Sequence, residues 1–245
     1  MTADPPAPDD GAGRGPVRRR ASLARRDVMV AALAIVDADG VDALSIRRLA
    51  QALGRSPMAL YHHAENKGDL LDGIIELLLE EVRIDAAAPD WRAELRRVGH
   101  GFRALALAHP HSVTLLVTRP LATPLGLRPL GTLRPLEAFL QLMTAAGMAG
   151  PDALGAYRWF FAVLHGHVLD EVQEFVADPE EHDDLLRLGL HHLPLRQFPV
   201  VRSLASEIGR YDGAAQLDRG LDVLLTSFAK AIGEGGAPPV AAAQG

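Results

Sequence analysis

The chain of 245 residues contains no cysteine, which excludes a disulfide framework and a thiolate metal site. No apolar run reaches the roughly 18 residues that a membrane-spanning helix needs, and no apolar signal segment follows the N-terminal charges, so a cytoplasmic protein without membrane contact is expected. The net charge of −6 argues weakly against a nucleic-acid partner, but residues 1–68 carry ten Arg and Lys against eight Asp and Glu, a net of +2, which leaves −8 for the remainder.

Residues 1–21 are rich in Pro, Gly, Asp and Arg and are predicted to form a disordered basic arm. In and just after this arm, a run without any acid holds six arginines: Arg14, Arg18, Arg19, Arg20, Arg25 and Arg26. A solvated tail and an arm that contacts DNA phosphates both fit such a run. A helix is predicted next, from about Leu23 to Asp39, with its inward residues at helical spacing: Val28, Ala32, Ile35 and Val36.

Two short helices with a tight turn between them are predicted in Leu44 to Asn66, LSIRRLAQALGRSPMALYHHAEN. Ser45 is placed to cap the first helix, because its hydroxyl can accept a free first-turn N–H. The apolar residues of that helix share one face: Ile46, Leu49, Ala50 and Leu53. Gly54 follows where a helix end often needs a left-handed residue.

The second short helix is predicted from Pro57 to His63, with Ser56 as its cap and Pro57 preset for the first helical position. It is too short to be stable alone, so neighbours must hold it, and Leu60 is the apolar residue that can do so. Its outer side would present Ser56, Met58, Ala59, Tyr61 and His62. This arrangement indicates a helix-turn-helix, whose second helix fits the major groove of B-DNA, about 12 Å wide. Beside it, contact between the basic arm and DNA becomes the favoured interpretation.

A long helix is predicted from Asn66, its cap, to about Arg83, with Asp69 as the capping-box partner. The free N–H groups at its start, beside Lys67, suit a phosphate. Residues 67–85 would connect the first domain to a second, and Ala86 to Asp90 would be the linker.

The remainder predicts only helices, without any strand pattern, so the fold class is all-α. Pro129 and Pro135 are expected to prevent one long helix in their region. The predicted helices span Trp91 to Ala108, Ser112 to Val117, Pro135 to Ala146, Pro151 to Val176, Leu193 to Ile208 and Asp212 to Ile232, with a polar break at Asp178 to Asp184 and a frayed tail at 234–245.

The segment AALAIVDADGVDALSIRRLAQALGRSPMALYHHAENKGDLLDGII, Ala31 to Ile75, resembles the tetracycline-repressor (TetR) family of bacterial transcription regulators. The later segments HSVTLLVTRP, GPDALGAYRWFFAVLHGHVLDE and AQLDRGLDVLLTSFAKAI resemble the effector domain of its tetracycline-repressor branch more loosely. The resemblance implies an N-terminal three-helix domain at 22–66, with the helix-turn-helix at about 45–64, and a larger helical effector-binding and dimerisation domain at 90–233.

The resemblance also implies DNA contacts. The residue matching Arg47 reaches a base or phosphate in the family, and residues matching Tyr61 and Lys67 contact phosphates. A solvated charge pair for Arg47 and Arg48, and core packing for Tyr61, are the alternatives. Arg55 replaces an aliphatic residue of the family. The candidate DNA-contacting residues are Arg47, Arg48, Arg55, Ser56, Pro57, Met58, Ala59, Tyr61, His62 and Lys67.

The effector site departs from that of the tetracycline-binding members. Leu115 stands where they have the metal-binding histidine, Arg83 replaces a second histidine and Val98 an asparagine. A small, largely apolar effector is therefore expected instead of a metal–tetracycline complex, with no metal and no cofactor. The candidate ligand-binding residues are Phe102, Leu115, Thr118, Arg119, Phe139, Met143, Phe161, His165 and Asp170, for which plain core packing is an equal alternative. His165 and His167 lie two apart on one helix and so do not form a metal pair.

The predicted function is a ligand-responsive repressor that binds double-stranded operator DNA and leaves it when a small molecule binds. As the resemblance implies, two chains would pair through helices at about 151–176 and 212–232 and set their recognition helices about 34–36 Å apart. An activator or corepressor-dependent regulator is one alternative. An enzyme that uses the effector cavity is another, although no nucleophile–base arrangement is evident.

Overall fold

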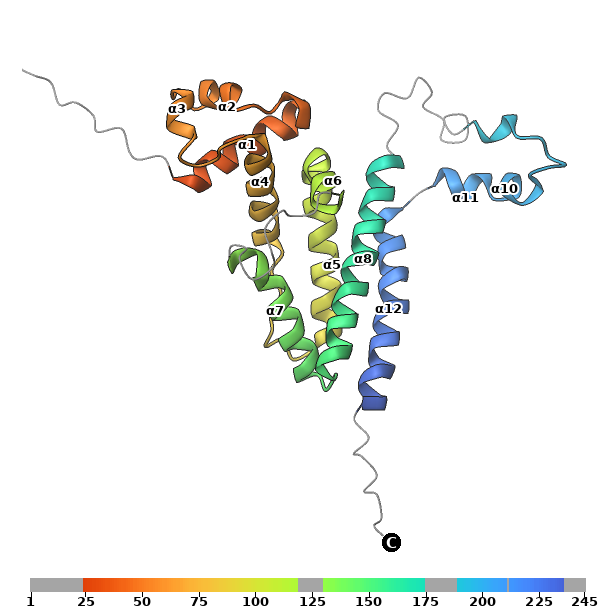
Figure 1. Cartoon of the computed structure of the whole chain (residues 1–245). Coiled ribbons are helices and arrows are strands. Elements are labelled where there is room, and N and C mark those ends of the chain that lie inside the picture. Colours follow the sequence, from red (N-terminus) through yellow and green to blue (C-terminus); the bar gives the residue numbers. More distant parts are fainter. Residues whose placement is uncertain (1–23, 119–129, 175–188, 211, 236–245) are drawn as a thin grey trace, which may run out of the picture.

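The computed structural model describes residues 24–118, 130–174, 189–210 and 212–235, and within these ranges every regular element is a helix (Figure 1). The all-α prediction is confirmed for them. The predicted arm at 1–21, the polar break at 178–184 and most of the tail at 234–245 lie outside the described residues. None of the helices in the described ranges combines the length and apolar character that crossing a bilayer requires.

The N-terminal helices form a small group at one end of the molecule (Figure 1). They are α1 (Arg25–Asp39), the 3-10 turn η1 (Val41–Ala43), α2 (Ile46–Ala52), α3 (Pro57–Leu60) and α4 (Lys67–Glu81). Their buried residues make one hydrophobic cluster, to which α1 contributes all four residues that the sequence predicted to face inward. Leu70, Ile74 and Leu78 of α4 belong to the same cluster, so α4 packs into this domain as well as leading out of it.

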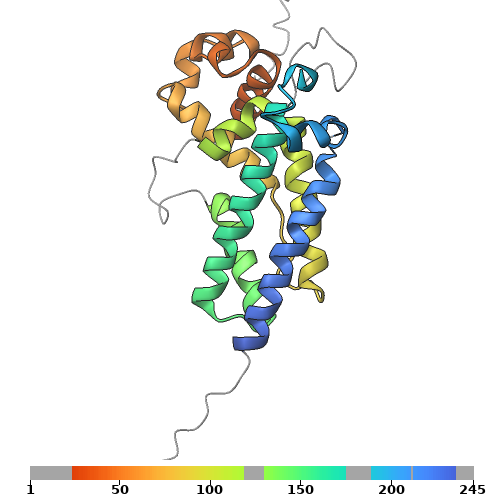
Figure 2. The ribbon, with the colours of Figure 1, turned by 90° about the vertical axis from the view of Figure 1, so that its right-hand side faces the viewer.

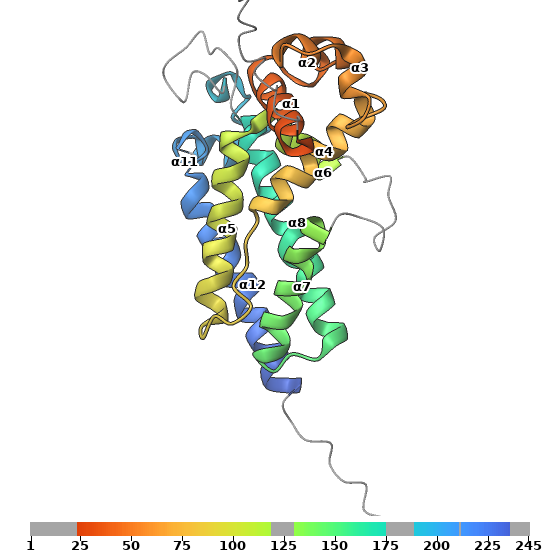
Figure 3. The ribbon, with the colours of Figure 1, turned by 90° about the vertical axis from the view of Figure 1, so that its left-hand side faces the viewer.

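The larger domain contains longer helices that run alongside one another (Figure 3). Its elements are α5 (Trp91–Ala108), α6 (Pro110–Thr118), α7 (Leu130–Ala145), α8 (Gly150–Glu174), the 3-10 turn η3 (Leu190–His192), α10 (Pro199–Ser203), α11 (Ala205–Gly209) and α12 (Gly213–Gly235). A second hydrophobic cluster lies between α5, α7, α8 and α12. Helices α8 and α12 lie side by side and form one outer face of the molecule (Figure 2).

Helix α7 corrects one prediction, because it begins at Leu130 and continues through Pro135. Proline removes the hydrogen bond to the carbonyl four residues earlier, which here is that of Gly131, and only the second turn of the helix loses a bond. Pro135 is itself buried, and α7 packs against both α8 and α4. Burial of apolar surface therefore offsets the lost bond.

The predicted helix from Leu193 to Ile208 is also wrong in detail. The structure divides this region into η3, α10 and α11. Pro199 occupies the first helical position of α10, and proline disfavours helical geometry in the residue before it. The end of α4 at Glu81, rather than at about Arg83, is a smaller difference.

Candidate functional site

Local signals set the turn between α2 and α3 as the sequence predicted. The Ser45 hydroxyl accepts a hydrogen bond from the Arg48 N–H at 3.2 Å. Leu49 and Ala50 of α2 are buried in the N-terminal cluster. Gly54 has a φ of +60°, a left-handed conformation that glycine adopts without strain.

Helix α3 is shorter than predicted, with four residues instead of the seven from Pro57 to His63. Ser56 is at the N-cap, but its side chain makes no capping bond, so that part of the prediction is wrong. The Ser56 carbonyl instead accepts the Ala59 N–H at 3.0 Å. After the helix, the N–H groups of His63 and Ala64 donate to the Leu60 carbonyl, which closes the turn. The Leu60 side chain is fully buried and fixes α3 to its neighbours.

The opposite side of this motif is accessible. We call it the outer surface of α2–α3 and define it by Arg47, Ser56, Met58, Tyr61 and His62, all of which are exposed. Met58 exposes 73% of its surface and Tyr61 47%. Pro57 is also exposed, and Ala59 and Lys67 are half-buried beside it. Tyr61 is therefore partly covered, which leaves room for a packed ring with an accessible hydroxyl.

Two candidate arginines differ from the rest. Arg48 pairs with the carboxylate of Asp39 at the end of α1, so it would have to leave that partner to reach DNA. Arg55 is half-buried and takes part in an interaction within the chain. Arg47 is exposed and forms no ion pair with another residue that the structure describes, which makes it the more available of the two consecutive arginines.

The start of α4 and the start of α1 both lie beside the outer surface of α2–α3. The predicted capping box is confirmed, because Asn66 Oδ1 accepts the Asp69 N–H at 3.1 Å and the Asp69 carboxylate accepts the Asn66 N–H at 3.3 Å. Arg25, which follows the predicted arm, pairs with Glu76 of α4 at 2.8 Å. Arg25 also lines the same surface hollow as Tyr61 and His62.

A polar contact that the sequence analysis missed joins the two domains. Asp37, near the end of α1, accepts a hydrogen bond from the Ser112 hydroxyl at 3.1 Å and lies 2.7 Å from Nδ1 of His109. His111 Nδ1 lies 3.2 Å from the Val36 carbonyl. These partners are more than 70 residues apart in the chain, so no local pattern signals them.

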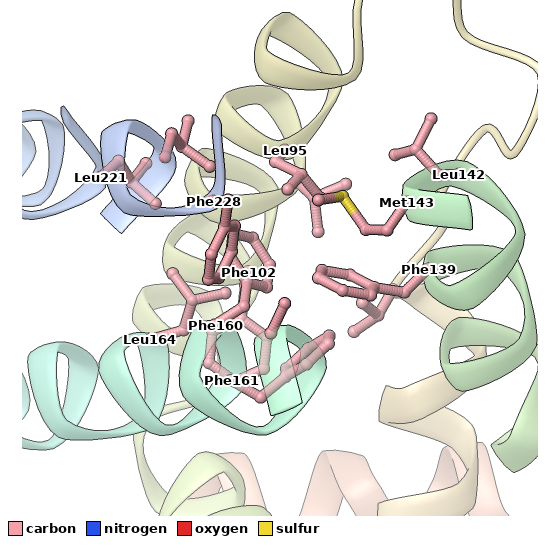
Figure 4. Packing of buried hydrophobic residues seen from close by; sticks show 14 of the residues in the cluster. Leu95, Phe102, Phe139, Leu142, Met143, Phe160, Phe161, Leu164, Leu221 and Phe228 are labelled. Carbon is pink, nitrogen blue, oxygen red and sulfur yellow. The ribbon is translucent and has the colours of Figure 1, made fainter. Parts of the chain in front are cut away.

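Aromatic side chains from α5, α7 and α8 pack together at the centre of the larger domain (Figure 4). Phe102, Phe139, Met143 and Phe161 are all buried there, as four of the predicted ligand residues. The rings of Phe102 and Phe161 lie 6.2 Å apart, and the His165 ring lies 5.4 Å from that of Phe102. Burial lowers the pKa of His165, so its imidazole is neutral at pH 7.

A cleft of about 330 Å³ opens between the end of α4 and α5, beside this aromatic cluster. Val82, Arg83, Val98, Phe102 and Leu105 line it, together with His109 of the contact between the domains. Near its edge, the hydrogen-bonded Arg97 guanidinium holds the pKa of Glu94 below its ordinary value. Such a cleft is in the size range of small-molecule sites.

Of the predicted ligand residues that the structure describes, Phe102 alone lines this cleft. Phe139, Met143, Phe161 and His165 lie in the aromatic cluster instead. Leu115 packs against the N-terminal cluster. Asp170 is exposed on the outer face of α8 and α12, in a separate hollow. The side chain of Thr118 and the whole of Arg119 lie outside the described residues. Within the described ranges, no group of three or more His, Asp or Glu is arranged to hold a metal ion.

Comparison with known proteins matches both domains. Residues 28–74 match the family model described as bacterial regulatory proteins, tetR family, and residues 95–193 match the tetracyclin repressor-like C-terminal domain. The chain is 32% identical to the transcriptional repressor DrrR1 of Streptomyces coeruleorubidus, over 84% of this chain and 73% of the relative. It is 30% identical to the class A tetracycline repressor from Escherichia coli, over 83% of this chain and 89% of that protein.

Solved structures agree with the sequence comparison. ActR from Streptomyces coelicolor in its apo form superposes with a TM-score of 0.71 at 27% identity, covering 87% of this chain and 98% of ActR. ActR has also been solved in complex with actinorhodin, and that structure gives the same TM-score. With an exposed helix-turn-helix on a helical effector-type domain, and both family models matched, this chain belongs to the TetR family of DNA-binding transcription regulators.

Proposed function

We propose that this protein is a dimeric repressor that binds operator DNA through the outer surface of α2–α3 and leaves it when a small, largely apolar effector binds. The exposure of the residues around α3 supports DNA binding. A four-residue helix whose inward Leu60 is fully buried holds Met58 and Tyr61 outward, where they are 73% and 47% exposed. A short helix displayed in this way on a packed support suits the major groove. The name of the relative DrrR1 supports repression rather than activation.

The residues on this surface suggest how DNA is read. Arg47 is exposed and carries a planar fork of donors that suits guanine or a phosphate. Tyr61 can donate its hydroxyl to a phosphate, and the ammonium group of Lys67, at the start of α4, can pair with another. Met58 and Ala59 have apolar side chains, so they can contact only a thymine methyl group or respond to the shape of the groove. Sequence preference therefore depends on Arg47, Ser56 and DNA shape.

The proposed effector site is the cleft beside the aromatic cluster. Val98, Phe102 and Leu105 supply its apolar lining, with the neutral His165 ring against Phe102. Its polar lining comes from Glu81, Arg83, Arg97 and His109. Leu115 cannot replace the metal-ligating imidazole of the tetracycline-binding relatives, so a magnesium–tetracycline complex does not suit this site. That the relative ActR was solved with actinorhodin supports a small-molecule effector.

The cleft also suggests how binding could be transmitted. Val82 and Arg83 at the end of α4 line it, and so does His109, which contacts Asp37 of α1. A ligand that fits only one position of these groups would shift the conformational equilibrium of the N-terminal domain toward that position. The free energy of this shift cannot exceed the difference between the ligand's binding free energies for the two states. Two chains paired through α8 and α12 would then lose the spacing of about 34–36 Å that matches one DNA turn.

A mobility-shift assay with DNA upstream of the protein's own gene tests the proposal. Arg47→Ala and Tyr61→Ala should each weaken binding by about tenfold or more, because each removes a contact worth about 1–3 kcal/mol. Arg134→Ala, an exposed arginine of α7, is the matched control and should bind as the wild type does. Unchanged binding in both test variants, with helical circular dichroism retained, would remove this surface from the interface.

The effector claim has a separate test. Tetracycline with Mg²⁺, added to the protein–DNA complex, should leave the shifted band in place, because Leu115 stands where the tetracycline-binding relatives have their metal-binding histidine. Release of DNA by low concentrations of that complex would contradict the apolar effector and leave the DNA interface unaffected.

A further inference from the structure

Helices α8 and α12 form one outer face of the molecule (Figure 2), and several side chains on that face are exposed. We call it the paired face and define it by Trp159, Gly166 and Asp170 of α8 and Arg219, Gly220 and Val223 of α12. Trp159 exposes 67% of its surface and Val223 75%. No atom would come within 4 Å of a Cβ added at Gly166 or Gly220, so another backbone could approach closely there.

A hollow of about 460 Å³ lies in this face between the two helices. Val163, His167 and Asp170 line one side, and Gln216, Arg219 and Gly220 line the other. The His167 side chain is only 9% exposed, and its Nε2 atom lies 3.5 Å from Oε2 of Glu171, without a hydrogen bond to any described residue.

The charges of the hollow differ from those of their immediate neighbours. Glu171 turns inward, where its carboxylate accepts a hydrogen bond from Arg103 Nε at 2.8 Å, and Asp218 lies 2.8 Å from His100. Asp170 and Arg219, each next in sequence to one of these, are exposed and form no ion pair within the described ranges. The contacts of Glu171 and Asp218 therefore join α8 and α12 to α5, while Asp170 and Arg219 are available to a partner.

The positions of this acid and base suit a second copy of the chain. Helix α8 ends at the same end of the molecule at which α12 begins (Figure 1), and Asp170 and Arg219 line the same hollow between the two helices. In a twofold dimer whose axis runs along these helices, α8 of one copy faces α12 of the other. An isologous interface then repeats each contact, so Asp170 meets the partner subunit's Arg219 and the reverse.

On the basis of the proposed dimer, we propose that Arg219 of each copy enters the hollow of the other and pairs with Asp170. The dimer is thus specified by two reciprocal ion pairs at the edge of an apolar contact around Trp159 and Val223. Such pairs fix the register of an interface and exclude wrong partners.

Two charge-reversal variants distinguish ion pairs between the two copies from an ion pair within one chain. A dimer of Asp170→Arg chains would place arginine against arginine twice, and a dimer of Arg219→Asp chains would place aspartate against aspartate twice. A mixed dimer of the two variants would have two opposite-charge pairs again. If Asp170 and Arg219 instead paired within one chain, mixing the variants would restore nothing.

Sedimentation velocity of the full-length chain measures the dimer dissociation constant for each sample. Each variant alone should raise it by about tenfold or more, because like charges meet at the interface, and the equimolar mixture should return it to within about threefold of the wild-type value. Arg134→Asp, with the same charge change on α7, is the matched control and should dimerise normally. Asp170→Asn and Arg219→Gln, which remove charge without repulsion, should weaken the dimer less and cover the case in which a reversal prevents folding.

The outcomes separate the two proposals. A monomeric wild-type chain would overturn the dimer itself. A wild-type dimer that neither reversal weakens would overturn the reciprocal ion pairs and leave the dimer intact. Weakening by both variants without recovery in the mixture would show that the two residues pair within one chain, which also overturns the inference.

Discussion

The two domains place their candidate functional residues in opposite positions relative to their hydrophobic cores. In the N-terminal domain, Arg47, Met58 and Tyr61 lie on the outside of a small core that Leu60 helps to form. In the larger domain, Phe102, Phe139 and Phe161 are the core. Binding and stability should therefore be separable by mutation in the first domain and inseparable in the second.

Phe139→Ala should produce the largest effect. Phe139 is fully buried, with the Phe160 ring at 5.5 Å, so truncation leaves a large cavity. We expect a loss of about 3–5 kcal/mol in the free energy of unfolding, measured by urea denaturation. Met58→Ala on the outer surface of α2–α3 is the contrasting variant and should change stability by less than about 0.5 kcal/mol. Similar losses in both variants would remove the distinction between the domains.

Leu60→Ala tests the one residue of α3 that is both buried and part of the DNA-binding motif. Its removal should cost about 2–5 kcal/mol, because the side chain is completely buried in the N-terminal cluster. Since α3 has only four residues, DNA binding should be lost as well. Denaturation and a mobility shift measured on the same preparation check both parts. Normal DNA binding by a destabilised variant would show that α3 is held by something else.

A pair of cap variants gives a smaller and sharper comparison. Asn66→Ala should destabilise the protein by about 0.5–2 kcal/mol, because it removes the side-chain bond to the Asp69 N–H. Ser56→Ala should have little effect on stability, because the Ser56 side chain makes no capping bond. Thermal denaturation of both variants measures the difference. An equal loss at Ser56 would mean that its hydroxyl caps α3 in solution.

The pH dependence should reveal the buried histidine of the aromatic cluster. Burial lowers the pKa of His165 from its ordinary 6.5, so the unfolded chain binds a proton at a pH where the folded chain does not. The free energy of unfolding should therefore fall as the pH drops through 6.5 toward the lowered value. His165→Phe should reduce this fall, measured as the difference in Tm between about pH 7.5 and pH 5.5. An identical pH dependence in that variant would exclude His165 as a source.

The difference between local and long-range contacts explains which features could be predicted from the sequence. Ser45, Gly54 and the Asn66–Asp69 pair act on their own turns, so their roles in α2 and α4 could be predicted from a few residues. The helical position of Pro135 within α7 could not be predicted in this way, because burial against α4 and α8 overrides the local preference of proline against helix. The contacts of Asp37 with His109 and Ser112 depend on the packing of α1 against α6. The position of Leu115 against the N-terminal cluster also depends on long-range packing.

The predicted contacts of the individual DNA-binding and ligand-binding residues remain predictions. The structure nevertheless changes which of these residues we expect to be the main contacts. Arg48 pairs with Asp39, which favours Arg47 as the first contact. Asp170 faces outward between α8 and α12, which removes it from the aromatic cluster and places it on the paired face.

The central claim is that the outer surface of α2–α3 enters duplex DNA and reads it. Its most direct test is the ratio of dissociation constants for unrelated DNA and operator DNA, measured by fluorescence anisotropy at one salt concentration. The wild-type chain should prefer its operator by about a thousandfold or more, and Arg47→Ala, which removes the proposed base contact, should lower that ratio by at least about tenfold while the fold is retained. An unchanged ratio in this variant would contradict the claim.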